Sequence, residues 1–578
     1  MTHIKKYEEW LNDSYINETD RSELLSISDN AAEIEDRFFK DLEFGTGGMR
    51  GVLGIGTNRL NIYTVRKATQ GLADYIAEQG ENHKKMGVVI AYDCRRMSPE
   101  FTDEAALVLA ANGIPAYVFD SLRPTPVLSF AVRHLGCTAG IVITASHNPP
   151  EYNGYKVYWQ DGGQVPFPRD EAIIHKVNEI KNFRQIKIID KKSAADANLY
   201  RTATAEVDDA FIHCVKNQSL KPEIISNSKL KIVYTPLHGS GYVPVCRALK
   251  EAGFKNLYVV DKQAEADGNF PTVKSPNPED KNAFKMALEL AEQKNADIVV
   301  ATDPDADRVG AFVKSKDGYV PFTGNMTGVL LTEYILGRLN ETGKLPKNGA
   351  VISTIVSTDL TRLIAAAYGA EYFNVLTGFK YIGEKIKQFE ETGSHEFLFG
   401  FEESYGSLAG SYARDKDAVV SAMLLCEAAA YYMQFGMTLT DAIDGIYKKY
   451  GYFTESIDNI AFKGSAGIED MKRIMNGMRK NPPLDLNGFA VSEIRDYLNG
   501  TVKNLSSGET TPTGLPVSDV LYFDCGDAWF CARPSGTEPK IKIYYGICVK
   551  NKDLSESKTE AAAALEKMSK ELRGLIGA

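Results

Sequence analysis

Three aspartates, Asp303, Asp305 and Asp307, stand at alternate positions in the loop TDPDADR. Carboxylates this close repel one another unless a cation lies among them, and their hard oxygens suit Mg²⁺, Mn²⁺ or Ca²⁺. The loop is not an EF-hand, because Arg308 and Lys314 occupy the positions where that loop needs glycine and glutamate. Since the loop closes the apolar run ADIVVA, we favour a metal site over a solvated acidic turn.

Ser146 lies in the polar stretch TASHNPPEYNGYK, which follows the apolar run GIVI. A serine hydroxyl is a poor nucleophile without a base or a metal, and no GxSxG elbow surrounds this one. If Ser146 carried a phosphate, that group would supply oxygens to the metal, which would polarise it for transfer. Lys156 could then move a proton if desolvation lowers its pKa. The alternative is that Ser146 only caps a turn or a helix.

Two further loops have the composition of ligand-binding loops. The segment RPSGTEPK, residues 533–540, offers a guanidinium, hydroxyls and a glycine that suit a tetrahedral anion, although a plain hairpin turn is the alternative. The segment FGFEESYG holds Glu402 and Ser404, which could bond sugar hydroxyls or lie in a surface turn. In ARDKDA, Arg414 and Lys416 could neutralise a phosphate or form surface ion pairs.

These loops follow strands of a pattern that occurs three times: strand, polar loop, helix ending at glycine, and strand. The copies begin at GVVIAYD, LKIVYT and GAVIST, and each later has a third strand, GIVI, IVVA or FLFG, that opens into one of the loops above. Short apolar strands alternating with helices predict α/β units with largely parallel sheets. Ligands bind beyond the carboxyl ends of such strands, so each copy offers one loop to a site.

The flanking segments differ from the three copies. Residues 1 to about 43 have the pattern of an amphipathic helix, and 501–516 has the composition of a loop. The stretch WFCARPSGTEPKIKIYYGI predicts strand, loop and strand before a final helix. We therefore expect four domains, at 1–205, 206–322, 323–448 and 449–578.

Composition excludes several classes of protein. The net charge is -10, and without a run of lysines and arginines a nucleic-acid partner is not expected. No apolar run is long enough for a membrane span and no signal peptide is visible. The eight cysteines form no CxxC pair, which favours reduced thiols in a cytoplasmic protein.

Together the loops resemble the α-D-phosphohexomutase superfamily. TASHNP, DPDADR, FEES in place of GEES, and RPSGTEP occur in that order, and FGTGGMRG, TGFKYIG and ASHNPPEYNGYKVY are similar to the branch that contains bacterial phosphoglucomutases and phosphopentomutases. The resemblance implies three tandem α/β domains with mixed sheets and a smaller C-terminal α+β domain around a central cleft. Phe401 stands where the family usually has the glycine of GEES, so we expect a reshaped sugar pocket.

The resemblance also implies roles for individual residues. Ser146 would be phosphorylated and would hold Mg²⁺ together with Asp303, Asp305 and Asp307, while Lys156 would be the general base and His147, also in the motif, keeps an open role. Substrate contacts are implied for Arg50, Arg308, Thr377, Gly378, Glu402, Ser404, Lys416, Arg533, Ser535, Gly536 and Thr537, of which the last four would clamp the distal phosphate.

The implied reaction interconverts glucose 1-phosphate and glucose 6-phosphate through phosphoserine and glucose 1,6-bisphosphate, which makes the expected enzyme an isomerase. A phosphopentomutase or phosphomannomutase using the same mechanism is the alternative. A metal-dependent phosphatase could use the same acidic loop, and an inactive sugar-phosphate-binding protein is disfavoured by the intact motifs. We expect small sugar phosphates as partners and either a monomer or a dimer.

Overall fold

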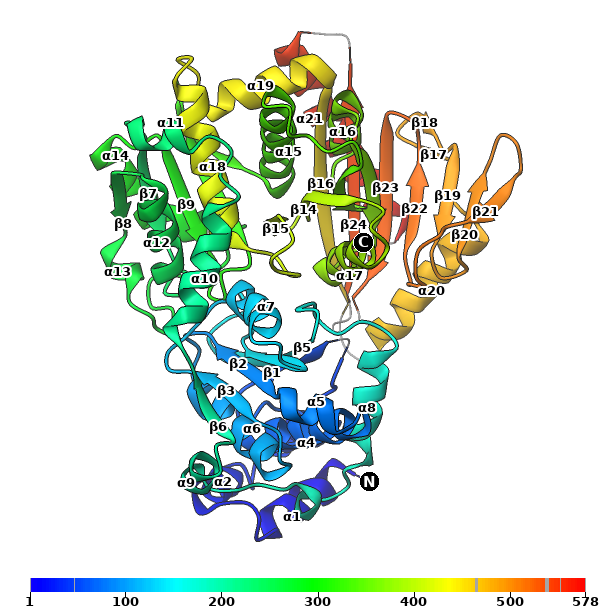
Figure 1. The fold of residues 1–578 in the computed structure, drawn as a ribbon. Coiled ribbons are helices and arrows are strands. Elements are labelled where there is room, and N and C mark those ends of the chain that lie inside the picture. The colour runs from blue at the N-terminus through cyan, green and yellow to red at the C-terminus, as the bar shows by residue number, and fades with distance from the viewer. Residues whose placement is uncertain (1, 46, 463–465, 536–539, 551–552, 577–578) are drawn as a thin grey trace. The chain divides into compact units, whose positions relative to one another are not determined.

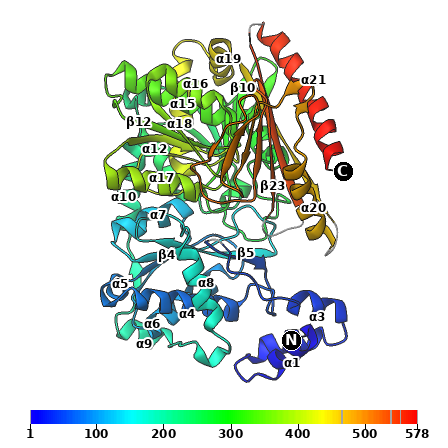
Figure 2. The ribbon, with the colours of Figure 1, turned by 90° about the vertical axis from the view of Figure 1, so that its right-hand side faces the viewer.

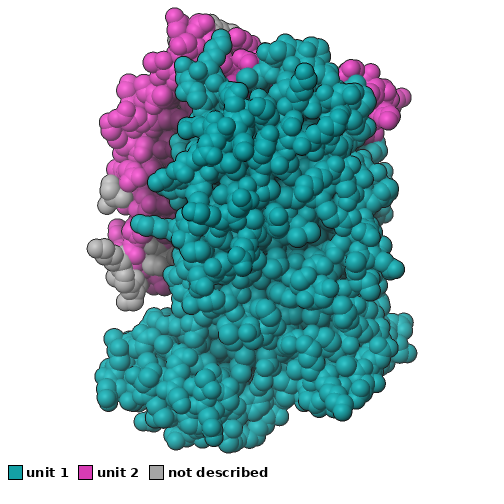
Figure 3. Space-filling view, turned by 90° about the vertical axis from the view of Figure 1, so that its left-hand side faces the viewer, with its two compact units in different colours: residues 1–327, 348–350, 379–439 teal, residues 328–347, 351–378, 440–578 magenta. Residues whose placement is uncertain are grey.

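The computed structural model describes residues 2–45, 47–462, 466–535, 540–550 and 553–576 (Figure 1). It divides into two compact units, coloured separately in Figure 3. Unit 1 comprises residues 1–327, 348–350 and 379–439, and unit 2 comprises residues 328–347, 351–378 and 440–578. No helix within the described part of the chain combines the length and the apolar character needed to cross a membrane.

The N-terminal segment forms three short helices, α1 (His3–Asn12), α2 (Glu18–Ser26) and α3 (Ala31–Phe38). The prediction of one amphipathic helix up to about residue 43 was wrong. The physical reason is capping: the side chains of Asn17 and Asn30 accept hydrogen bonds from the first turns of α2 and α3, so each asparagine starts a new helix.

The first α/β part of the chain builds a six-stranded sheet with the order β1-β5-β4-β2-β3-β6. Strands β2, β3, β4 and β6 run parallel, whereas β5 runs antiparallel to both β4 and β1. Helix α7 covers one face of the sheet, and α4, α6 and α8 cover the other (Figures 1 and 2). The elements are β1 (Gly48–Val52), α4 (Ile62–Glu78), α5 (Glu81–Met86), β2 (Val88–Tyr92), α6 (Ser98–Ala111), β3 (Ala116–Phe119), α7 (Thr125–His134), β4 (Ala139–Ile143), β5 (Tyr152–Trp159), α8 (Arg169–Glu179), the 3-10 helix η1 (Phe183–Gln185), α9 (Lys191–Asp196) and β6 (Tyr200–Ala203).

The second α/β part has a five-stranded sheet with the order β11-β10-β9-β7-β8. Its β7, β8 and β9 are parallel, and β10 and β11 return antiparallel. The sheets formed by the first and second copies of the strand–helix–strand pattern are thus both mixed, as predicted. The elements are α10 (Ala205–Lys216), α11 (Pro222–Asn227), β7 (Lys231–Thr235), α12 (Tyr242–Ala252), β8 (Asn256–Val259), α13 (Asp261–Ala264), the 3-10 helix η2 (Lys281–Phe284), α14 (Lys285–Lys294), β9 (Ile298–Thr302), β10 (Val309–Ser315) and β11 (Gly318–Phe322).

The third copy contributes elements to both units. Strands β14 and β15 pair antiparallel in unit 1, whereas α16 and β13 belong to unit 2. Gly253 and Gly369 follow α12 and α16 with φ of 117° and 74°, the left-handed helix stop that the sequence predicts. The elements are α15 (Gly324–Glu341), β12 (Gly349–Thr354), α16 (Leu360–Tyr368), β13 (Glu371–Val375), α17 (Phe379–Thr392), β14 (Glu396–Phe401), β15 (Ser407–Ala409), α18 (Ala418–Met433) and α19 (Leu439–Tyr450).

The C-terminal part of unit 2 is rich in β structure. A seven-stranded sheet has the order β16-β24-β23-β22-β19-β20-β21. The expected strand pair is confirmed, because β23 and β24 pair antiparallel. The loop expected at 501–516 instead contains β20 and β21, which pair at the sheet edge around a turn at Asn504–Gly508. The elements are β16 (Tyr452–Ala461), α20 (Ala466–Lys480), β17 (Asp485–Leu486), β18 (Phe489–Ala490), β19 (Glu493–Asp496), β20 (Thr501–Asn504), β21 (Thr510–Pro512), β22 (Leu521–Asp524), β23 (Ala528–Pro534), β24 (Lys540–Val549) and α21 (Leu554–Leu575).

Candidate active site

Ser146 lies just beyond the carboxyl end of β4 and is only 3% exposed. Its φ of 50° is left-handed, which is uncommon for a residue other than glycine. The backbone N–H donates to Thr144 Oγ1 at 2.8 Å, and the hydroxyl donates to Asp303 Oδ2 at 2.7 Å. The serine hydroxyl therefore points at the aspartate loop, the segment that contains Asp303, Asp305 and Asp307, although the two segments are far apart in sequence.

Arg95 binds the backbone of the serine loop, the segment of residues 144–156 that contains Ser146. Its fully buried guanidinium donates to the backbone carbonyls of Ser146 at 2.6 Å, Pro149 at 2.9 Å and Tyr152 at 2.8 Å. Asp93 accepts from the hydroxyl of Thr144 at 2.6 Å. Both residues follow β2, the parallel neighbour of β4, so the same sheet edge brings them to the loop.

Asp303, Asp305 and Asp307 lie between β9 and β10 and are buried. Each offers a carboxylate oxygen within 4.8 Å of the others. Burial and the two neighbouring carboxylates raise the pKa of Asp303. Asp305 Oδ1 and Asp307 Oδ1 have no hydrogen-bond partner, and unpaired buried carboxylate oxygens of this kind fit a hard divalent cation.

Two lysines neutralise part of this negative charge. Lys156 on β5 lies 3.0 Å from Asp305 Oδ2, and Lys416 lies 3.1 Å from Asp307 Oδ2. Although burial opposes ionisation, Lys156 lowers the pKa of Asp305. Burial likewise opposes the charge of Lys416, but Asp307 and Asp415 raise its pKa above the ordinary value. Both ammonium groups therefore lie at the edge of the aspartate cluster.

Strand β1 brings Arg50 to the same loop. Arg50 pairs in register with Gly154, and its guanidinium donates to Asn148 Oδ1 at 2.9 Å. Gly48, two residues earlier, lies opposite Lys156, and a Cβ built there would be 2.0 Å from the carbonyl oxygen of Tyr155. Only glycine allows this close approach of β1 to β5.

His147 and Arg308 complete the rim of the serine and aspartate loops. The imidazole Nδ1 of His147 is 3.1 Å from Ser146 Oγ. Burial and the cations Arg308 and Arg50 lower the pKa of His147 to about 2, so the ring is neutral. Arg308 forms an ion pair with Glu279, and despite burial, that carboxylate and Asp307 raise its pKa.

The loop after β14 adds acidic and hydroxyl groups in unit 1. Glu402 is 5% exposed, and Ser404 is half-buried. Phe401, which stands where the family usually has glycine, is 1% exposed and stacks on Phe399 with ring centroids 5.9 Å apart. Arg414 is also buried and pairs with Glu390, so only Lys416 of the two candidate cations joins the cluster.

The remaining candidates belong to unit 2. Thr377 and Gly378 lie between β13 and α17, and the buried Thr377 Oγ1 has no hydrogen-bond partner. Arg533 lies on β23, and the N–H of Ser535 donates to the carbonyl of Lys540 at 2.8 Å. Gly536 and Thr537 lie outside the described residues.

Eleven of the site residues predicted from the sequence lie in unit 1. Asp93, Arg95 and Thr125 also belong to the site but were not predicted. The hydroxyl of Thr125 donates to Asp305 Oδ2 at 2.9 Å. The position of Asp93 and Arg95 directly after a parallel strand is the signal that would have identified them.

Comparison with known proteins defines the class to which this fold and site belong. Models of the phosphoglucomutase/phosphomannomutase α/β/α domains I, II and III match residues 41–184, 209–318 and 323–450. Phosphoglucomutases from Staphylococcus aureus strains MRSA252 and MSSA476 are each 38% identical, over 89% and 90% of this chain and 92% and 93% of theirs.

Solved structures share the fold. A putative phosphomannomutase from Thermus thermophilus matches with a TM-score of 0.65 and 23% identity, over 91% of this chain and 99% of that one. The open form of the Paramecium phosphoprotein pp63/parafusin, a phosphoglucomutase, matches with a TM-score of 0.68 and 17% identity, over 92% and 95%.

The matches identify the enzyme class as the phosphohexomutases, which are isomerases. The chain belongs to the phosphoglucomutase/phosphomannomutase family of the α-D-phosphohexomutase superfamily.

Proposed function

We propose that this enzyme is a phosphoglucomutase that interconverts glucose 1-phosphate and glucose 6-phosphate through phospho-Ser146. The hydrogen bond of 2.7 Å from Ser146 Oγ to Asp303 carries the proposal, because a phosphoryl group on that oxygen would lie beside three carboxylates suited to a cation. The 38% identity to proteins named phosphoglucomutase supports glucose as the sugar.

Mg²⁺ is the cation we propose for Asp303, Asp305 and Asp307; when bound, it would neutralise charge on the phosphoryl group and polarise it. Arg50 and Arg308 would bind the equatorial phosphate oxygens. Lys156, as the neutral amine, would accept the proton of the attacking sugar hydroxyl, and its partner Asp305 would orient its side-chain nitrogen.

In the forward direction, O6 of glucose 1-phosphate attacks phosphorus, the P–O bond to Ser146 breaks, and glucose 1,6-bisphosphate forms. After the bisphosphate reorients, Ser146 takes the phosphoryl group from O1 and glucose 6-phosphate leaves. Glu402, Ser404, Thr377, Gly378 and Lys416 would contact the sugar phosphate, and Arg533, Ser535, Gly536 and Thr537 would bind whichever phosphate is not reacting. The number of phosphoryl groups is conserved in each step, and the serine is rephosphorylated.

Intact-mass measurement tests the covalent step. Protein incubated with glucose 1,6-bisphosphate should gain one phosphate, and peptide mapping should place it on Ser146 within residues 144–156. Full mutase activity in protein that never carries this phosphate would overturn the proposal.

Substrate assays separate the remaining alternatives. Glucose 1-phosphate should react with the highest kcat/KM among the 1-phosphates of glucose, mannose, ribose and deoxyribose; a pentose or mannose preference would indicate a phosphopentomutase or phosphomannomutase. Steady phosphate release without bisphosphate dependence would indicate a phosphatase.

All eight cysteines are free, which supports the cytoplasm as the site of action.

A further inference from the structure

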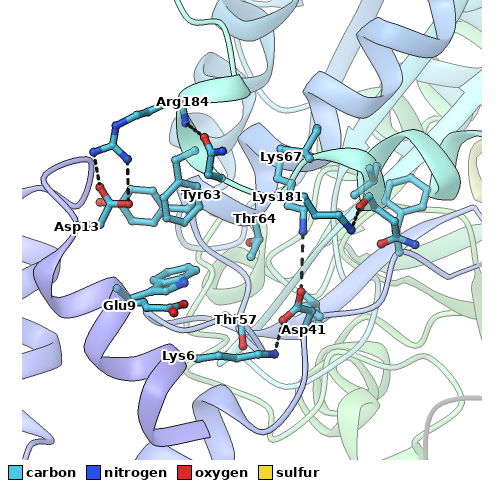
Figure 4. A pocket seen from close by; sticks show the side chains of 18 of the residues that line it. Lys6, Glu9, Asp13, Asp41, Thr57, Tyr63, Thr64, Lys67, Lys181 and Arg184 are labelled. Carbon is cyan, nitrogen blue, oxygen red and sulfur yellow. Dashed lines mark hydrogen bonds and ion pairs between the residues drawn. The ribbon is translucent and has the colours of Figure 1, made fainter. Parts of the chain in front are cut away.

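Unit 1 contains a cavity of about 780 Å³ among the N-terminal helices, α4 and the segment from α8 to η1 (Figure 4). Its lining residues are distinct from all the active-site candidates described above. Cavities of this size hold nucleotide-sized or drug-sized molecules. Six of the 23 lining residues precede residue 41, where the match to family domain I begins.

One end of the cavity carries more positive than negative charge. The ammonium groups of Lys6 and Lys67 share one carboxylate, Asp41, at 2.7 Å and 3.9 Å, and Lys181 lies beside them (Figure 4). Burial and the neighbouring cations Lys181 and Lys6 lower the pKa of Lys67, although Asp41 opposes this shift. Three cations with one anion form a site that an anionic group would stabilise.

Glu9 also lines the cavity, and the other two acidic side chains of the lining besides Asp41 are held in ion pairs. Asp13 pairs with Arg184 at 3.2 Å, and Glu43 pairs with Lys40 at 3.5 Å. Even with Glu9 counted beside Asp41, the three cations Lys6, Lys67 and Lys181 outnumber these two carboxylates.

The wall beside this end is aromatic. Trp10 packs edge-on against Tyr63 and Phe183, with ring centroids 5.6 Å and 5.2 Å apart. Trp10 is half-buried and lines the cavity. An aromatic wall of this kind binds flat rings by stacking or edge contacts, and a ring and an anion are the two parts of a nucleotide.

From these features we infer that the cavity is a second ligand site, which binds a nucleoside monophosphate. The phosphate lies among Lys6, Lys67 and Lys181, and the base lies against Trp10 and Phe183.

Calorimetric titration of the full chain with AMP, GMP and UMP tests the site. At least one nucleotide should bind with one-to-one stoichiometry and quench the fluorescence of Trp10. Binding should persist with saturating glucose 6-phosphate, because the two sites have no residue in common. Adenosine and inorganic phosphate should each bind at least tenfold more weakly than AMP, since each makes half of the contacts.

Variants locate the binding. Lys67→Met and the exposed Lys181→Met should each weaken nucleotide binding at least tenfold. The matched control Lys176→Met alters a lysine of α8 that pairs with Glu78 outside the cavity, and it should leave affinity within twofold. Thermal unfolding of each variant checks the fold, and Lys181→Met keeps the test valid if Lys67→Met unfolds.

Four results would overturn the inference. They are no saturable binding of any of the three nucleotides, displacement by glucose 6-phosphate, equal affinity for phosphate or adenosine alone, and unchanged affinity in the folded lysine variants.

Discussion

Among single side chains, the carboxylates of the aspartate loop indicate most clearly where a cation would bind. The buried oxygens Asp305 Oδ1 and Asp307 Oδ1 have no hydrogen-bond partner, and a buried acceptor left unpaired costs about 1–3 kcal/mol. Lys156 and Lys416 reach the other oxygen of each group. The two lysines therefore compensate only part of the charge.

Asp305→Asn should weaken metal binding because it removes one of three anionic ligands. We expect the Mg²⁺ concentration for half-maximal activity to rise at least tenfold, and Mn²⁺ binding followed by electron paramagnetic resonance to weaken in parallel. The control Asp317→Asn alters an exposed carboxylate in the β10–β11 turn and should change neither. An unaltered Mn²⁺ affinity in Asp305→Asn would argue against the site.

Ser146→Ala should lower kcat at least a thousandfold, because no hydroxyl remains to carry the phosphoryl group. The fold should persist, since the substitution removes only one side-chain hydrogen bond to Asp303 and one contact with His147. Coupled assay of glucose 6-phosphate formation measures the first effect and thermal unfolding the second. Near-normal turnover would contradict the assignment of Ser146.

At the scale of elements, Arg95 is a positioning residue for the serine loop. Its guanidinium donates to the carbonyls of Ser146, Pro149 and Tyr152, so the loop depends on a residue that is fully buried. Arg95→Lys keeps the charge but loses the planar fork of donors.

We expect Arg95→Lys to lower kcat about tenfold to a hundredfold while KM changes less than threefold, since misplacement of a reacting atom acts on the transition state. The rate of Ser146 phosphorylation by glucose 1,6-bisphosphate should fall in parallel. Arg96→Lys is the control, because the side chain of the exposed Arg96 donates a single hydrogen bond, to the carbonyl of Pro150. A rise in KM alone would show that Arg95 does not position the serine.

Asp417 caps the N-terminus of helix α18, and its carboxylate accepts from the N–H groups of Val419 at 2.7 Å and Val420 at 3.2 Å. Burial raises the pKa of Asp417 to about 6. The native state thus holds this proton more tightly than the unfolded chain, so the contribution to stability is full below about pH 4 and is lost as pH rises through about 6.

Asp417→Asn keeps an acceptor oxygen for the cap but cannot ionise. Between pH 4.5 and 7, the wild-type free energy of unfolding should fall relative to that of the variant by about 2 kcal/mol. Urea denaturation of both proteins across this range measures the difference. Parallel pH curves would show that Asp417 does not titrate in this window.

The strand–helix–strand copies could be predicted because apolar periodicity and glycine stops are local signals. The sequence also located the aspartate and serine loops, since each follows a predicted parallel strand. The sequence could not reveal that new helices start after Asn17 and Asn30. An asparagine caps a helix only where the backbone leaves the helical conformation, and its residue type alone does not show this. Neither could it show that Phe401 is buried, which depends on packing against Phe399.

For the whole molecule, the candidates for phosphate binding are divided between the two units. Ser146 and the aspartates belong to unit 1, and Arg533 belongs to unit 2. Arg533→Ala should raise KM for glucose 1-phosphate at least tenfold with a smaller change in kcat. The reason is that the substitution removes a phosphate contact that stabilises the bound substrate and the transition state equally. Arg473→Ala, an exposed residue of α20 that pairs with Asp470, is the control. If KM stays normal, Arg533 does not bind the distal phosphate.

The contact at Gly48 also bears on how genetic data for this enzyme should be interpreted. Any side chain there would push β1 away from the carbonyl of Tyr155, and Arg50 and Lys156 would shift together because the strands pair at that point. In a saturation mutagenesis screen, this glycine would tolerate no replacement and would score like a catalytic residue, although it contributes no reactive atom.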